Sequence, residues 1–263
     1  MEEQQGQTWC ATLAWRGGAC AGWHLQPNVR TIQGEVEQAL ARLCGTTDPV
    51  RVSATGRTDA GVHAEMQIIG FRLLVDRLPH QVVAGINQFT DDDIVCLDAK
   101  PVSSNFSPRS WTKEKLYRYR ILNRIQPCPF RVGLTWHLHH RLDVVKMQTA
   151  LPAIVGTHDF TSFRAARCAA KTAVRHIVRA EIVRLANDEV QLDFVGHGFL
   201  RHQVRIMVGT LIDIGLGRRE PDSLAQIRDA QDRSAAGRTA PAHGLTLVHV
   251  TLMDEAKPRA PLR

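Results

Sequence analysis

The chain has 263 residues, 44% of them hydrophobic and 22% charged, an ordinary globular composition with enough apolar surface to bury a core. Its polar, acidic first residues are unlike a signal peptide, and no apolar run approaches the roughly 18 residues of a membrane helix. We therefore expect a cytoplasmic protein without a membrane partner. The formal net charge of +7 favours a polyanionic partner, nucleic acid before membrane, and a merely basic, soluble enzyme is the alternative.

The first half of the chain begins with a predicted strand over 8–15 and a Gly-rich turn at 16–18. A helix follows over about 31–44, which Thr31 can cap and Gly45 ends. The remaining elements of this half are three strands, near 50–54, 66–75 and 94–99, and a short helix near 80–87.

A similar pattern of strands and helices restarts at Lys113. The predicted strands are 113–123, 134–139, 173–186, 189–196 and 245–252. The predicted helices are 143–155, with a kink at Pro152, then 198–214, and a short one that opens at Asp222. Runs of strands interrupted by helices, with hairpin-like spacings, predict an α+β fold with mainly antiparallel sheets and helices on one side.

This repetition predicts two similar subdomains. The first covers 1–105 and carries an unusual loop described below, and the second covers 106–256. Two such units side by side leave a cleft between them. The last residues, 257–263, read as a flexible basic tail.

Cysteines and histidines give no metal signature. The six cysteines are scattered without a C-x-x-C pair, which is typical of reduced thiols in a cytosolic protein. His137, His139 and His140 invite a metal interpretation, but strand alternation puts His140 on the opposite face from the other two. Because no thiol or carboxylate cluster accompanies them, we expect no metal site.

The segment over 53–64 sets one carboxylate, Asp59, among small residues. Arg57 lies two positions before it and His63 four positions after it. The flanks read as strands, so the segment is a loop held by a sheet, where catalytic side chains are often presented. The alternative is that Asp59-Ala60-Gly61 is only a turn, chosen for backbone reasons.

In the strand that starts the second half, the period of two puts Tyr117 and Tyr119 on one face and Arg118 and Arg120 on the other. Tyrosines on a strand can stack on an unpaired base. The alternative is that they are core aromatics with hydroxyls at the edge, which we favour for Tyr119.

Two further segments carry arginines among apolar residues. In the helix over 198–214, Arg201 and Arg205 lie one turn apart on one face. An arginine in such an apolar helix is costly to bury without a carboxylate, for which Asp59 is the candidate. The alternative is a surface Arg205 that meets solvent or phosphate. The segment over 159–167 interleaves aromatics with Arg164 and Arg167, as RNA-contact loops often do.

Together these segments resemble the TruA family of tRNA pseudouridine synthases over nearly the whole chain, in order. The most specific match is Gly56-Arg57-Thr58-Asp59-Ala60-Gly61-Val62-His63. The supporting matches are Gly22-Trp23, Tyr117-Arg118-Tyr119, the segment over 159–164, Phe199-Leu200, Val204-Arg205, Val208-Gly209 and Gly244-Leu245. This chain departs from the family pattern at Arg16, His24 and Ile206, which leaves the central motif unchanged but affects the expected N-terminal RNA contacts.

The resemblance implies an isomerase without metal or organic cofactor, which acts on uridines at positions 38, 39 and 40 of the tRNA anticodon arm. It implies a homodimer whose two halves flank a basic cleft. Asp59 matches the catalytic aspartate and Tyr117 the active-site tyrosine, and Arg205 matches the arginine that pairs with the aspartate.

Other residues receive lesser roles from the same resemblance. Arg57 is similar to an arginine linked with flipping of the target base, and Leu245 belongs to the substrate contacts. The expected RNA contacts are Arg118, Arg164, Arg167 and Arg201. A catalytically idle tRNA-binding or folding protein on the same scaffold is the alternative. A glycosidase is disfavoured because no second acid accompanies Asp59.

Overall fold

The computed structural model describes residues 6–166 and 168–253 of the chain. The described residues divide into two compact units: the first unit holds 6–113 and 247–253, and the second unit holds 114–246. The sequence predicted a boundary at 105 and placed the last strand in the second half. In the structure most of that strand, 247–252, groups with the first unit, while 245–246 group with the second. The predicted tail lies outside the described residues.

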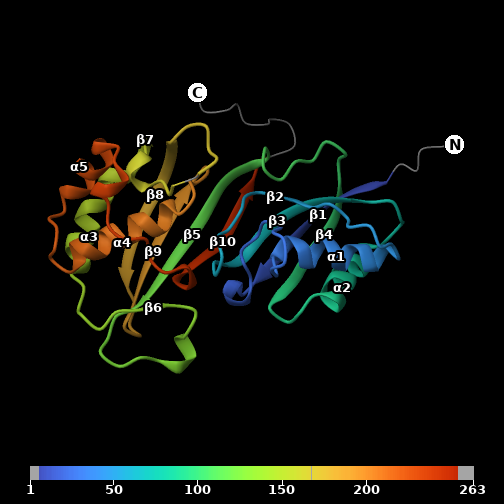
Figure 1. The fold of residues 1–263 in the computed structure, drawn as a ribbon, viewed down its shortest axis with the longest axis horizontal. Coiled ribbons are helices and arrows are strands. Elements are labelled where there is room, and N and C mark those ends of the chain that lie inside the picture. The colour runs from blue at the N-terminus through green and yellow to red at the C-terminus, as the bar shows by residue number, and fades with distance from the viewer. Residues whose placement is uncertain (1–5, 167, 254–263) are drawn as a thin grey trace. The chain divides into compact units, whose positions relative to one another are not determined.

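The first unit is built on an antiparallel sheet in which β1 lies between β3 and β4 (Figure 1). Its strands are β1 (Gln7–Trp15), β2 (Ser53–Ala54), β3 (His63–Leu73), β4 (Ile94–Val102) and, next to β3, β10 (Leu245–Leu252). Its helices are α1 (Ile32–Cys44) and α2 (Pro79–Phe89), with a short 3-10 helix, η1 (Gly17–Ala19). The helices α1 and α2 pack against each other, and α2 lies along β4.

The ends of α1 follow from its sequence. The Thr31 side chain accepts a hydrogen bond from the Gly34 backbone N–H, and Gly45 ends the helix with a φ of 67°. Ile32, Val36 and Leu40 are fully buried, so the predicted apolar stripe is confirmed.

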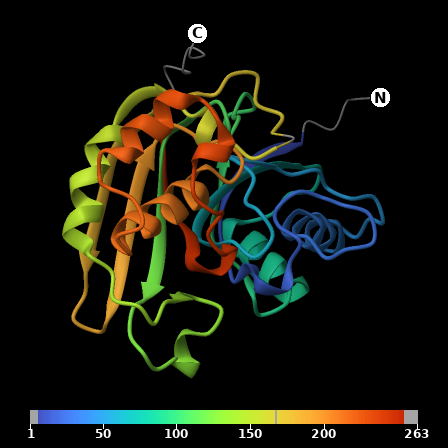
Figure 2. The same cartoon turned by 60° about the vertical axis from the view of Figure 1, so that its left-hand side comes forward.

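The second unit carries an antiparallel sheet in the order β5-β9-β8-β7, with β6 parallel to β5. The strands are β5 (Thr112–Leu122), β6 (Trp136–His137), β7 (Gly156–Asp159), β8 (Val174–Arg184) and β9 (Glu189–Gly196). The helices are α3 (Val144–Ala150), α4 (Gln203–Gly215) and α5 (Ser223–Ala230), with five 3-10 helices: η2 (Pro129–Arg131), η3 (Leu151–Ile154), η4 (Thr161–Phe163), η5 (Arg233–Ala235) and η6 (Ala242–Gly244). In Figure 2, α4 and α5 (orange to red) lie in front of the strands, and α3 packs on both β8 and α4.

The predicted α+β class with mainly antiparallel strands is confirmed, and two helix boundaries are corrected. The helix predicted over 143–155 ends at Ala150 and continues as a 3-10 turn that contains Pro152, since proline has no N–H to continue the helical ladder. The helix predicted from Gly198 begins only at Gln203, because His202 adopts a left-handed φ of 61° just before it. Arg201 therefore precedes α4, and the predicted one-turn pairing of Arg201 with Arg205 on a helix is wrong.

No helix among the described residues is long and apolar enough to cross a bilayer.

Candidate active site

The loop that carries Asp59 joins β2 to β3 and turns tightly at its tip. The Val62 N–H donates to the Asp59 carbonyl over 3.2 Å, and Gly61 supplies a φ of 79°, which glycine adopts without strain. Asp59 is half-buried and Arg57 is exposed. The Asp-Ala-Gly turn that sequence reasoning offered as an alternative thus exists, and the carboxylate stands upon it.

The stem of this loop is fixed by a buried amide. Gln67 on β3 has no solvent exposure, and its side-chain nitrogen donates to the Gly56 carbonyl over 2.8 Å. Its side-chain oxygen accepts from the Thr55 hydroxyl. The Thr55 N–H also donates to the Ile68 carbonyl over 3.1 Å, so the side of the stem that follows β2 is held by β3.

The N-terminal segment over 15–23 forms a cradle around the same loop. The Trp15 indole donates to the Val62 carbonyl over 3.1 Å, and the Trp23 N–H donates to the Thr58 carbonyl over 3.2 Å. The Gly17 N–H donates to His63 Nδ1 over 3.1 Å, so this buried imidazole is an acceptor within the fold. These bonds reach the loop on both sides of Asp59.

Two glycines let the cradle approach this closely. A Cβ at Gly17 would lie 2.1 Å from the Val62 carbonyl oxygen. Gly22 has a φ of 98°, and a Cβ there would lie 2.9 Å from the Thr58 oxygen and 3.0 Å from the Ala60 nitrogen. Sequence reasoning linked Gly22 to the family pattern but gave it no role. The glycine itself was the available signal, because glycine is typical of positions where two backbone segments approach closely.

In the second unit, β5 presents its two tyrosines on one face, as predicted. Tyr119 is fully buried, and its hydroxyl donates to the Pro241 carbonyl over 2.8 Å, which confirms it as a core aromatic. Tyr117 keeps 9% of its surface exposed and packs edge-to-face on Phe199, with ring centroids 5.2 Å apart and an interplanar angle of 86°. Tyr117 is thus largely buried as well, but it keeps more exposed surface than Tyr119.

Arg205 lies in the first turn of α4 and is half-buried. Its Nε donates to the Ala240 carbonyl over 2.8 Å, and the Ala240 N–H returns a bond of 3.0 Å to the Arg205 carbonyl. The segment over 237–241, here called the strap, runs along α4 at this point. Gly209 makes the approach feasible, since a Cβ there would lie 1.8 Å from the Arg238 oxygen.

The strap also reaches β5 and leads to Leu245. Pro241 accepts the Tyr119 hydroxyl, and a Cβ at Gly244 would lie 2.6 Å from the Tyr119 ring. Leu245, 5% exposed, follows directly. The strap thus bonds to both Arg205 and Tyr119 and leads through η6 to Leu245. Asp59 belongs to the other unit, so its pairing with Arg205 stays a prediction.

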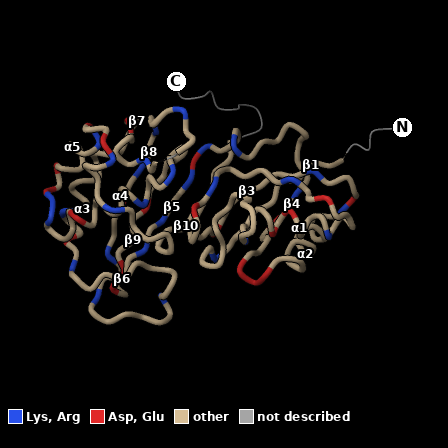
Figure 3. The backbone as a smooth tube through the Cα atoms, in the orientation of Figure 1, with Lys and Arg blue, Asp and Glu red and all other residues tan. Residues whose placement is uncertain are grey.

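Many basic residues lie along β5 and β8 (Figure 3). The four predicted RNA-contact arginines differ in their surroundings. Arg118 forms a two-pronged ion pair with Asp193 over 2.9 and 2.8 Å. Arg164 donates to the carbonyls of Cys168 and Ala170, both over 2.7 Å, and so shapes its own loop. Arg201 is exposed. Arg167 lies outside the described residues.

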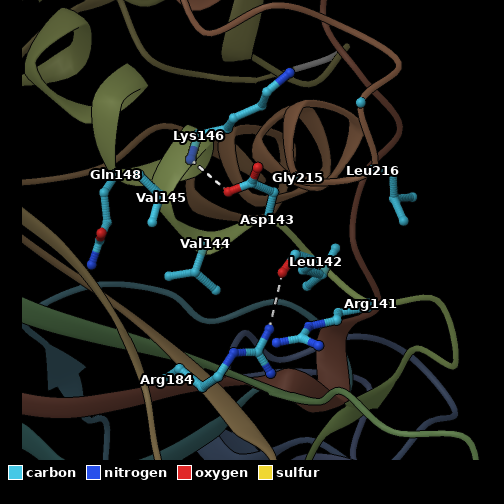
Figure 4. Close-up of a pocket in the computed structure, with 11 residues that line it drawn as sticks. Arg141, Leu142, Asp143, Val144, Val145, Lys146, Gln148, Arg184, Gly215 and Leu216 are labelled. Carbon is cyan, nitrogen blue, oxygen red and sulfur yellow. Dashed lines mark hydrogen bonds between the residues drawn. The ribbon is translucent and has the colours of Figure 1, made fainter.

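A surface hollow of about 760 Å³ in the second unit contains none of the predicted site residues (Figure 4). It is lined by Arg141, Lys146 and Arg184 among others. Arg184 donates to the Asn123 side chain and the Leu142 carbonyl, both over 3.0 Å, which gives it a structural role. Within the described ranges no three His, Cys, Asp or Glu side chains are grouped so as to hold a metal ion.

Comparison with known proteins defines the class. A family model described as tRNA pseudouridine synthase matches residues 150–251. A tRNA pseudouridine synthase A of Pelobacter propionicus is 41% identical over 240 residues, which cover 91% of this chain and 97% of the relative. The proteins of the same name from Myxococcus xanthus and Halalkalibacterium halodurans are 40% and 43% identical, over 95% and 89% of this chain and 94% and 88% of those relatives. The chain belongs to the tRNA pseudouridine synthase A family.

Solved structures match this chain only weakly. A chain in the crystal structure of a Cbf5-Nop10-Gar1 complex aligns at 9% identity with a TM-score of 0.35, covering 90% of this chain and 57% of that one. The relatives of similar length, not this likeness, carry the family assignment.

Proposed function

We propose that this protein converts uridine to pseudouridine at positions 38, 39 and 40 in the anticodon arm of tRNA, with Asp59 as its catalytic residue. Family membership supports the reaction and the tRNA substrate. The observation that carries the choice of residue is the cradle: a half-buried carboxylate stands on a turn whose backbone is fixed on both sides. A fixed backbone keeps the reacting group in the geometry of the reaction, which lowers the activation barrier.

The chemistry fits a lone carboxylate. The bond from ribose C1′ to N1 breaks, the base turns, and a bond from C1′ to C5 forms, while the C5 proton leaves and N1 gains one. The reaction is redox-neutral and adds no water. An ionised Asp59 can attack covalently, or it can stabilise or deprotonate the ribose fragment.

The other residues then receive roles around the extruded base. Tyr117 stacks on it, which offsets part of the few kcal/mol that flipping costs, and the Tyr117 hydroxyl relays the C5 proton at the end. Arg57, exposed beside the carboxylate, assists flipping, Arg205 pairs with Asp59, and Leu245 contacts the substrate. Arg201 and Arg167 contact the RNA backbone. Arg118 and Arg164 act at the same RNA surface through the segments that their own bonds hold in place.

The protein works as a cytoplasmic homodimer that binds the anticodon arm through its basic residues. The net charge of +7 supports a polyanionic partner.

The test is site-by-site mapping of pseudouridine in tRNA from cells that carry the wild-type gene, no gene, or Asp59→Ala. We expect pseudouridine at positions 38 to 40 only with wild type, and a loss of more than about a thousand-fold in rate for the purified variant, since a catalytic group is removed outright. The affinity of Asp59→Ala for tRNA should stay within about three-fold, because phosphate contacts dominate binding. Asp48→Ala, at another acidic position in an exposed loop of the same unit, is the matched control.

Two results would contradict the proposal in different ways. If Asp59→Ala converts uridine at the wild-type rate, the catalytic assignment is wrong. If wild type binds tRNA but leaves all three uridines unconverted in cells and in vitro, the chain is an idle tRNA-binding or folding protein.

A further inference from the structure

Phe199 is the partner that packs against the Tyr117 ring, and it lies on the segment between β9 and α4. The two rings meet edge to face, with centroids 5.2 Å apart and an angle of 86°. Phe199 is itself half-exposed, whereas Phe160, Phe163 and Phe194 of the same unit are fully buried. Filling the core therefore does not explain its position.

The end of β9 makes room for this ring. In the register of β5 and β9, Tyr117 faces Phe194 and Lys115 faces Gly196, so Gly196 lies diagonally opposite Tyr117 on the same face of the sheet. A Cβ at Gly196 would lie 3.0 Å from Phe199 Cζ. The Phe199 ring thus lies over the place where β9 carries no side chain, beside Tyr117.

The backbone around Phe199 is fastened on both sides. The His197 N–H donates to the His176 carbonyl over 3.2 Å, which holds the segment to β8. The Leu200 N–H donates to the Gln203 side-chain oxygen over 2.8 Å, and the Gln203 N–H returns a bond to Leu200 over 3.1 Å. Because Gln203 is fully buried in the first turn of α4, the Phe199 ring is held by a fixed support.

We propose that Phe199 is a positioning residue, which holds the Tyr117 ring in one orientation and thereby directs its hydroxyl at the reacting base. This inference rests on the proposed function. An edge-to-face partner restricts rotation of the tyrosine about its side-chain torsions, since other orientations lose the favourable contact. The action of Phe199 is therefore carried through Tyr117 and not through contact with RNA.

A double-mutant cycle tests this claim. We expect Phe199→Leu to lower kcat by about five- to ten-fold, the equivalent of an aromatic pair, while KM stays within about two-fold. In the Tyr117→Phe background, which keeps the ring but removes the hydroxyl, the same substitution should change kcat by less than about two-fold. Phe199→Tyr keeps an aromatic ring and should restore kcat to within about two-fold of wild type.

Controls separate positioning from misfolding and from direct contact. Phe130→Leu makes the same exchange at a fully exposed phenylalanine of the second unit and should leave kcat unchanged. If Phe199→Leu does not fold by thermal melting, Phe199→Met replaces it with an unbranched side chain of similar volume. Equal losses in both backgrounds would overturn the claim and make Phe199 a direct contact, and so would wild-type kcat in Phe199→Leu or in Tyr117→Phe. An inactive wild type would instead refute the proposed function.

Discussion

The Asp59 loop and the Tyr117–Arg205 region are held in place by different kinds of contact. Around Asp59 the partners are main-chain groups: carbonyls of Gly56, Thr58 and Val62 accept hydrogen bonds from three side-chain or backbone donors. Around Tyr117 and Arg205 the contacts are made by the side chains of these two residues: the Tyr117 ring packs on the Phe199 ring, and the Arg205 guanidinium donates to the Ala240 carbonyl.

This difference decides which substitutions each region tolerates. A main-chain cradle with glycines at its closest approaches is sensitive to added atoms, since a new Cβ meets backbone that cannot move aside. A region held by side chains is sensitive to removed atoms, and its losses are graded because each contact contributes only about 0.5–1.5 kcal/mol.

Among substitutions that leave Asp59 in place, the largest expected effect comes from adding one methyl group to the cradle. Gly17→Ala puts a Cβ 2.1 Å from the Val62 carbonyl oxygen, so the cradle must shift away from the Asp59 loop. We expect a loss of about 3 kcal/mol in the free energy of unfolding, at the upper end for overpacking. Activity should fall about a hundred-fold, because a displacement near 1 Å of a reacting group has that effect. Urea unfolding and single-turnover pseudouridine formation measure the two.

The neighbouring glycine is the matched control for that experiment. A Cβ at Gly18 meets nothing within 4 Å, so Gly18→Ala should change stability by less than about 0.5 kcal/mol and leave activity intact. If Gly17→Ala and Gly18→Ala had equal stability and activity, the cradle would accommodate the added Cβ without loss. The proposed contrast between main-chain and side-chain support would then be wrong.

The sequence predicted the position of the Asp59 loop between two strands better than the contacts that support this loop. Asp59 stood out as a lone carboxylate between strands, and Tyr119 was favoured as a core residue from the period of its strand. The cradle was not predictable in the same way, because the contacts of Gly17 and Trp23 with Val62 and Thr58 join residues more than thirty positions apart, through backbone atoms that every residue has.

Helix α4 shows a second reason for failure. The apolar run continues from Gly198, and only the left-handed His202 marks where the helix begins. Most histidines still have negative φ, so the sequence alone does not predict a left-handed residue here, and the pattern extended the helix by a turn and placed Arg201 on it. The placement of Phe199 beside Tyr117 was hidden by the same error, since it depends on that non-helical segment.

A smaller effect is expected from removing one atom in the second unit. Tyr119→Phe deletes the hydroxyl that donates to the Pro241 carbonyl and leaves the ring in place. We expect about 1 kcal/mol less stability at pH 7, the value of one hydrogen bond, and a fall in kcat below about three-fold. If Tyr119→Phe lost as much activity as Gly17→Ala, the region held by side chains would be as sensitive to substitution as the cradle.

The pH dependence of that variant sharpens the test. Burial raises the pKa of the Tyr119 phenol above its ordinary value, so its contribution to stability is complete below a pH of about 10 and declines above it. The stability advantage of wild type over Tyr119→Phe should therefore shrink as pH rises past 10. Burial also raises the pKa of the Cys10 thiol, to about 11, and both proteins share that background. An advantage that is constant up to pH 11 would contradict the assignment.

The smallest effect tests an ion pair that fastens the cradle from outside. Arg30 makes two hydrogen bonds of 2.7 Å to the Asp93 carboxylate, and the Asp93 carbonyl accepts from the Arg16 N–H. Asp93→Asn should cost only about 0.5 kcal/mol at pH 7, since the pair is partly exposed and Asp91 also contacts Arg30, at 3.1 Å.

Hydrogen bonds from Arg30 lower the pKa of the Asp93 carboxyl, so this contribution is present above a pH of about 4 and is lost as pH falls below it. Urea unfolding at pH 7 and pH 3 measures the difference in the free energy of unfolding between wild type and Asp93→Asn, with Asp92→Asn as the exposed control. If this difference persists at pH 3, the charge of Asp93 does not stabilise the cradle.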